Sequence, residues 1–92
     1  MINRTRGDIL IEAHRIINGE RLDAYGSPED NFTKIADLWS AYLHWTITPL
    51  DVALMMTLFK IARIQTGSAT KDSFTDAAGY IALGDEIKNE KD

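Results

Sequence analysis

The chain has 92 residues, no cysteine and a formal net charge of −4, with acidic and basic residues spread along its length. This length fits one small domain over residues 1–92, and the lack of cysteine excludes disulfide frameworks, thiolate chemistry and cysteine-based zinc sites. The acidic balance argues against general nucleic-acid binding and against binding to anionic membranes, since both need a basic face.

The first half of the chain predicts two amphipathic helices. Thr5 and Asp8 have the spacing of a capping box, and an apolar stripe follows as far as Gly19, which we expect to end the first helix. Ser27 and Pro28 then provide an N-cap and a first helical residue for a second helix. Its apolar stripe comprises Phe32, Ile35, Ala36, Trp39, Tyr42 and Leu43.

The third predicted helix, from Thr48 to Gly67, is apolar almost all the way round. Thr48 can act as its N-cap, and Gly67 suits a left-handed turn at its end. Between Val52 and Ile64, apart from Thr57, only Lys60 and Arg63 interrupt its apolar surface. A helix of this kind is normally buried on every side, so both cations need partners.

A fourth helix is predicted to start between Thr70 and Ser73 and to run towards Lys88. No segment shows the alternation of a strand, so we expect an all-α, four-helix bundle-like domain around the central apolar helix. A chain of 92 residues cannot easily bury one helix on all sides. We therefore expect a homo-oligomer, a dimer or a larger assembly, in which central helices pack together.

Two aspartates in the fourth helix are the candidate metal ligands. Asp72 and Asp76 are four residues apart, so both carboxylates share one face, where they could hold Mg²⁺. Asp72 could equally stabilise the helix dipole, and Asp76 could instead be the ion-pair partner of Lys60 or Arg63.

Lys60 and Arg63 have two interpretations as well. They could form ion pairs with acids of the fourth helix, or they could clamp a phosphate group. A second candidate cluster for substrate binding contains Arg21, Tyr25 and Asn31, close to the start of the second helix, where free N–H groups favour anions. The alternative for this cluster is a turn followed by a helix cap.

Three segments carry a family resemblance: YGSPEDNF (25–32), DVALMMTLFKIAR (51–63) and DSFTDAAGYIAL (72–83). Together they resemble a family of small, all-helical phage and prophage proteins of unassigned function. More distantly, residues 72–83 are similar to the second acidic motif of MazG-like all-α nucleotide pyrophosphatases. Those enzymes cleave nucleoside triphosphates with Mg²⁺ and work as oligomers. Their first acidic motif, a cluster of glutamates, is missing here, since the first helix has only Glu12.

Two functional hypotheses follow. In the first, a phage-encoded protein binds or hydrolyses a nucleoside phosphate, as a Mg²⁺-dependent pyrophosphohydrolase would. Asp72 and Asp76 would then hold the metal, and Lys60 and Arg63 would neutralise the phosphate. In the second, the protein is a non-catalytic helical binder that sequesters a nucleotide signal or contacts a host protein. No apolar run approaches membrane-spanning length, so we expect a soluble protein in the host cytoplasm.

Overall fold

The computed structural model describes residues 4–20, 27–67 and 70–91. Within these ranges the chain forms four α-helices and no strand, which confirms the all-α prediction. The helices are α1 (Arg6–Arg15), α3 (Pro28–Leu43), α4 (Pro49–Thr66) and α5 (Thr70–Lys91). A π-helical turn, η1 (Ile16–Glu20), directly continues α1.

The ends of α4 lie where local hydrogen bonding predicts them. Thr48 and Asp51 form a reciprocal capping box, in which the Thr48 N–H donates to Asp51 Oδ2 over 3.0 Å. Gly67 closes the other end with φ of 79°, a left-handed conformation that glycine adopts without steric cost. Thr57, buried in the middle of α4, donates its hydroxyl to the Ala53 carbonyl.

The end of the first helix differs from the prediction. Regular α-helix stops at Arg15, and Gly19 lies inside η1 rather than at a helix end. The Asn18 side-chain amide donates to the His14 carbonyl over 3.0 Å. This bond takes up a backbone acceptor at the point where the α-helical pattern stops, as asparagine side chains can do.

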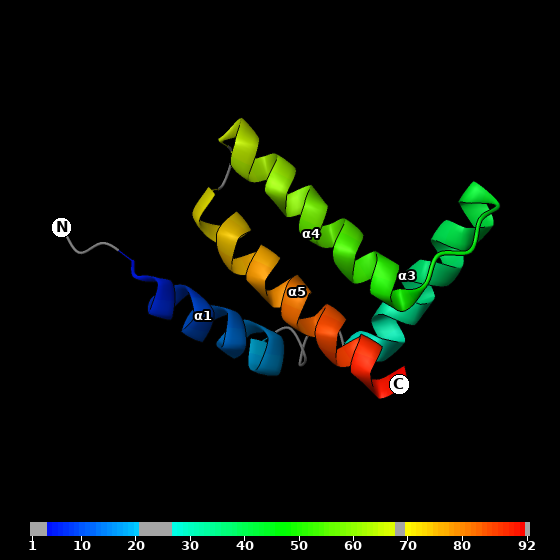
Figure 1. The fold of residues 1–92 in the computed structure, drawn as a ribbon, viewed down its shortest axis with the longest axis horizontal. Helices are drawn as coiled ribbons and strands as arrows, with labels where there is room; N and C mark the ends of the chain where they lie inside the picture. The colour runs from blue at the N-terminus through cyan, green and yellow to red at the C-terminus, as the bar shows by residue number, and fades with distance from the viewer. Residues whose placement is uncertain (1–3, 21–26, 68–69, 92) are drawn as a thin grey trace.

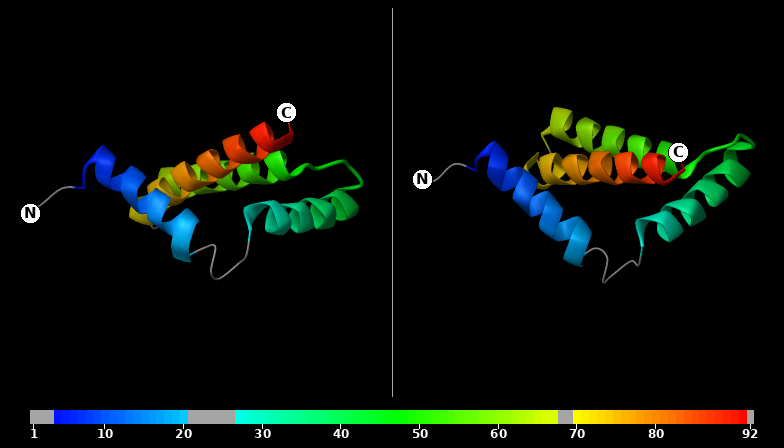
Figure 2. Two further views of the ribbon diagram at one scale, coloured as in Figure 1. Left: turned by 90° about the horizontal axis from the view of Figure 1, so that it is seen from below. Right: turned by 60° about the horizontal axis from the view of Figure 1, so that its bottom comes forward.

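Helices α4 and α5 form an antiparallel pair, and α1 packs against α5 while α3 packs against α4. Gly84 allows the pair to come close, because a Cβ there would lie 3.3 Å from the Ala53 Cβ. Both α1 and α3 lie on the same side of this pair (Figure 2). The core is built where α3, α4 and α5 meet, from Phe32, Ala36, Val52, Ala53, Tyr80, Leu83 and Ile87.

The outward side of α4 is exposed within one chain. The expectation that α4 is buried on every side therefore does not hold within a single chain, because α3 and α5 cover only one side of it. Arg63 is exposed as well, contrary to the expectation of a buried cation. In α3, Tyr42 and Leu43 are also exposed, because the end of this helix projects beyond the α4–α5 pair (Figure 1).

None of the helices in the described ranges combines the length and apolar character that a membrane-spanning segment needs.

Candidate functional site

A polar hollow lies between α1 and α5. Its volume is about 550 Å³, and we call it the α1–α5 groove. Four carboxylates and two guanidinium groups line it, so acids outnumber bases. The lining residues are Arg4, Asp8, Glu12, Arg15 and Ile16 on the α1 side, and Asp72, Thr75 and Asp76 on the α5 side.

Hydrogen bonds hold the charged side chains of the α1 side in place. Arg4 Nη1 donates to the Thr75 hydroxyl over 2.7 Å, which ties the segment before α1 to α5. Arg15 donates two hydrogen bonds to the Glu12 carboxylate, one of 2.7 Å from Nη2 and one of 3.2 Å from Nε. Such bidentate pairs fix geometry as well as charge. The groove therefore presents oriented charges on its α1 side.

Asp8 has a structural task in addition to lining the groove. Its Oδ2 accepts from the Thr5 backbone N–H over 3.0 Å, and its own N–H donates to the Thr5 hydroxyl. The pKa of Asp8 lies below its ordinary value of 3.8. The hydrogen bond from the Thr5 backbone N–H is the largest cause, and the hydrogen bond with the Thr5 side chain is the second. Asp8 is therefore ionised at neutral pH and adds negative charge to the groove.

On the α5 side, Asp72 and Asp76 both line the groove, as their spacing predicts. Asp76 is also engaged from α4, since Lys60 Nζ lies 3.0 Å from Asp76 Oδ2. The lysine side chain is 19% exposed and the aspartate side chain 32% exposed. Of the alternatives that the sequence leaves open for Asp76, the structure shows the ion pair with Lys60. Lys60 reaches the edge of the groove through this pair.

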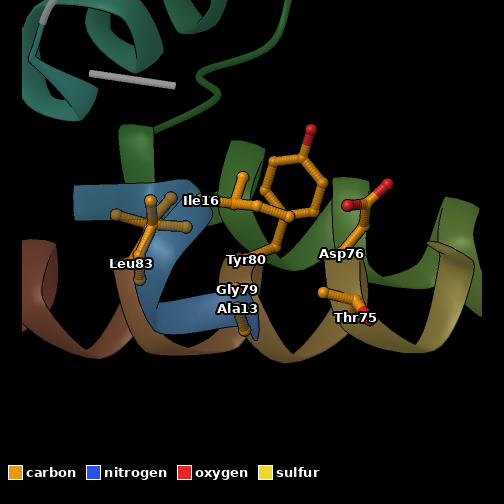
Figure 3. Close-up of a pocket in the computed structure, with 8 residues that line it drawn as sticks. Ala13, Ile16, Thr75, Asp76, Gly79, Tyr80 and Leu83 are labelled. Carbon is orange, nitrogen blue, oxygen red and sulfur yellow. The ribbon is translucent and has the colours of Figure 1, made fainter. Parts of the chain in front are cut away.

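A smaller hollow of about 60 Å³ adjoins the groove and shares Ile16, Thr75 and Asp76 with it. Figure 3 shows the Asp76 carboxylate and the Tyr80 ring standing side by side above α5, with Ile16 next to the ring. The other lining residues are mostly apolar: Ala13, Ile17, Gly79 and Leu83. The charged groove therefore adjoins a smaller hollow whose lining is mostly apolar.

Two other predicted site residues, Arg63 and Asn31, lie elsewhere in the described structure. Arg63 is not part of the groove; its guanidinium carbon lies 5.5 Å from the centre of the Phe59 ring. Asn31 sits in the first turns of α3 and lines neither hollow. Arg21 and Tyr25 lie outside the described residues. The structure therefore brings together Lys60, Asp72 and Asp76 from the predicted set.

Sequence reasoning missed the four charged residues on the α1 side of the groove. Asp8 was interpreted only as a helix cap, and Glu12 only as an isolated acid. A signal was present, because Asp8 and Glu12 are four residues apart, the same spacing as Asp72 and Asp76. Their relevance depends on the docking of α1 against α5, which no local pattern specifies.

A metal ion at this site would depend on ligands from outside the chain. Among the described residues, no three histidine, cysteine, aspartate or glutamate side chains lie close enough together to hold a metal ion. Mg²⁺ commonly takes only one or two protein carboxylates and completes its octahedron with waters and substrate phosphates. Asp72 and Asp76 fit that lower requirement by residue type and number.

Comparisons with known proteins identify relatives of this chain. The Gene 55 protein of Mycobacterium phage D29 is 49% identical over 82 residues, which cover 89% of this chain and 54% of the relative. The Gene 55 protein of Mycobacterium phage L5 is 41% identical over 85 residues, which cover 91% of this chain and 54% of the relative. The chain thus spans about half the length of these relatives. No solved structure matches it.

These relatives confirm the resemblance to phage proteins of unassigned function, whereas the likeness to MazG-like pyrophosphatases stays a prediction. A family described as a domain of unknown function, DUF6378, matches residues 8–88. That match covers most of the chain, which therefore belongs to the DUF6378 family.

Proposed function

We propose that this protein binds a nucleoside phosphate, together with Mg²⁺, in the α1–α5 groove. The main support for the proposal is that charged side chains from two helices line one groove of about 550 Å³. The acids outnumber the bases there, so a phosphate alone would be repelled. A divalent cation between the acids and the phosphate removes this repulsion.

Five charged side chains have a role in this proposal. Asp72 and Asp76 bind Mg²⁺, whose remaining positions are filled by water and phosphate oxygens. Arg4 and Arg15 line the same groove and supply planar donors for phosphate oxygens. Lys60, which contacts Asp76, orients that carboxylate and adds positive charge at the edge.

The nucleoside part of the proposal rests on the similarity of residues 72–83 to the second acidic motif of MazG-like enzymes. In a hydrolase of that type, Asp72 and Asp76 would hold the cation, whose charge would promote cleavage of the bond between the α and β phosphates by water, with release of pyrophosphate. The substrate pool and the Mg²⁺ that this reaction needs are those of the host cytoplasm.

A non-catalytic binder is the second candidate, and one observation favours it. Within the described residues, no three potential ligands are placed to hold a metal ion, whereas hydrolysis with two metals needs more than a lone pair of aspartates. A protein of this second kind would sequester a nucleotide signal and leave it intact.

The test is a thermal-shift panel of nucleoside mono-, di- and triphosphates and cyclic nucleotides, each with and without Mg²⁺. A ligand that binds only the folded state raises the melting temperature. We expect a Mg²⁺-dependent shift that Asp72→Asn weakens by about tenfold in affinity, corresponding to about 1.4 kcal/mol. Asp37→Asn removes an exposed carboxylate from the middle of α3 and serves as the matched control, with unchanged binding.

Product analysis of the same samples distinguishes hydrolysis from sequestration. Pyrophosphate and a nucleoside monophosphate among the products would identify a pyrophosphatase, whereas intact ligand would identify sequestration. A shift that survives chelation of Mg²⁺ would contradict the metal-bridged geometry. A panel without any shift would contradict both nucleotide candidates and leave contact with a host protein as the function.

A further inference from the structure

The side of the α4–α5 pair that faces away from α1 and α3 carries an uncovered apolar surface. On α4 the residues of this side recur every three or four positions, as one face of a helix does. None of them carries a charge, and all are exposed. They are Leu54, Met55, Leu58, Phe59, Ile61 and Ala62, and we call them the outer face of α4.

Helix α5 extends this surface. Gly79 faces η1, because a Cβ at that position would lie 3.1 Å from the Ile17 side chain. Ile81 follows two residues later and therefore points to nearly the opposite side of the helix. Phe74 lies seven residues before Ile81 and shares its side, and both side chains are exposed.

An uncovered surface of this kind differs from ordinary scattered apolar residues. Single exposed apolar side chains are common on monomers, but contiguous apolar patches mark interfaces. The helices of the described structure leave this side free, since α1 and α3 both lie on the other side of the pair (Figure 2). Within the described residues, no helix covers this side.

We infer that a second copy of this chain covers the outer face of α4, in an antiparallel arrangement about a two-fold axis near Thr57 and Leu58. The charges of α4 support a self-complementary contact. Asp51 lies six residues before Thr57 and Arg63 lies six residues after it, with Lys60 turned towards Asp76. In an antiparallel pair, Asp51 of each copy comes to the level of Arg63 in the other copy.

The same two-fold arrangement matches the apolar residues. A two-fold interface uses one surface patch on both copies, so the axis that pairs Asp51 with Arg63 also brings Met55 of each copy to the level of Phe59 in the other, with Leu58 one residue from the axis. Two α4–α5 pairs packed in this way form a four-helix arrangement with the outer faces inside. This inference does not depend on the proposed nucleotide site, which lies on the other side of α5.

Three leucines with nearly equal exposure provide the test. Leu58 on α4 is 62% exposed, Leu10 on α1 is 63% exposed and Leu38 on α3 is 64% exposed. The wild-type protein and the variants Leu58→Lys, Leu10→Lys and Leu38→Lys are compared by size-exclusion chromatography with light scattering at micromolar concentration. Circular dichroism monitors the helix content. We expect the mass of two chains for all except Leu58→Lys, which has the mass of one chain and unchanged helicity.

Any other pattern of masses among folded variants overturns the inference. A wild-type protein with the mass of one chain, or of three, contradicts the two-fold pairing. Dissociation by Leu38→Lys but not by Leu58→Lys would move the interface to the projecting end of α3. If Leu58→Lys loses its helicity, Leu54→Lys decides in its place, since Leu54 is exposed one turn earlier on the same face.

Discussion

Lys60 and Asp76 join α4 to α5 through a half-buried ion pair, with 3.0 Å between Nζ and Oδ2. The lysine also lies beside an aromatic side chain, with Nζ 5.6 Å from the centre of the Phe59 ring. An exposed ion pair contributes little to stability, but this pair is partly withdrawn from water and bridges two helices. It therefore has a structural role regardless of any ligand.

We expect Lys60→Met to lower the free energy of unfolding by about 1 kcal/mol, because Asp76 then stays partly buried without its partner. Urea denaturation of Lys60→Met, Asp76→Asn and the double variant measures this coupling as a double-mutant cycle. Arg63→Met is the matched control, and the exposed position of Arg63 predicts a change within about 0.5 kcal/mol. Equal effects of Lys60→Met and Arg63→Met would show that the pair adds no stability.

At the scale of single elements, the start of α1 links helix capping to the groove. Asp8 closes the capping box with Thr5 and lines the α1–α5 groove with the same carboxylate. Its pKa is lowered in the folded protein, chiefly by the hydrogen bond from the Thr5 backbone N–H. The charged form is thus favoured by folding.

This shift predicts a pH-dependent contribution of Asp8 to stability. A carboxyl whose pKa is lower in the folded state stabilises above its unfolded value, here 3.8, and loses that contribution as the pH falls through the folded-state pKa. We therefore expect Asp8→Asn to be less stable than wild type at neutral pH, with a difference that shrinks below about pH 4. Denaturant unfolding at several pH values measures it. Asp37→Asn controls for the loss of one negative charge, and a pH-independent difference for Asp8→Asn would contradict the prediction.

The link between α3 and α4 shows how local chemistry places an element. Ser40 Oγ accepts from the Ile47 N–H over 2.8 Å and donates to the Ile47 carbonyl, which closes the connection. His44 ends α3 in a left-handed conformation, with φ of 56°, a position that glycine more often occupies. The left-handed histidine was not predicted from the sequence.

In the molecule as a whole, only one side of the α4–α5 pair is covered by other helices. Helices α1 and α3 cover one side of the α4–α5 pair, and the other side presents the outer face of α4 to water (Figure 2). Because a chain of this size has a small core, the burial of this face in a second copy would be a large part of the folding free energy.

The inferred pairing therefore predicts a melting temperature that depends on protein concentration. Association stabilises the folded state by mass action, so wild type should melt at a higher temperature when it is more concentrated. Leu58→Lys should melt at one temperature throughout, and Leu10→Lys should behave like wild type. Differential scanning calorimetry over a wide concentration range measures this, and a wild-type melting temperature that does not change would contradict the pairing.

The number and order of the helices and both ends of α4 were predictable from the sequence, because such features depend on residues within a few turns of each other. Thr48, Asp51 and Gly67 delimit α4 as predicted. The sequence also indicated that Lys60 needs an acidic partner, and Asp76, which pairs with it in the structure, was one of the candidates. The exposure of Arg63, and the position of the acids of α1 in one groove with those of α5, follow from the packing of the helices. Those arrangements depend on contacts such as that of Arg4 with Thr75, which are 71 residues apart, and local hydrogen bonding and periodicity carry no information about such pairs.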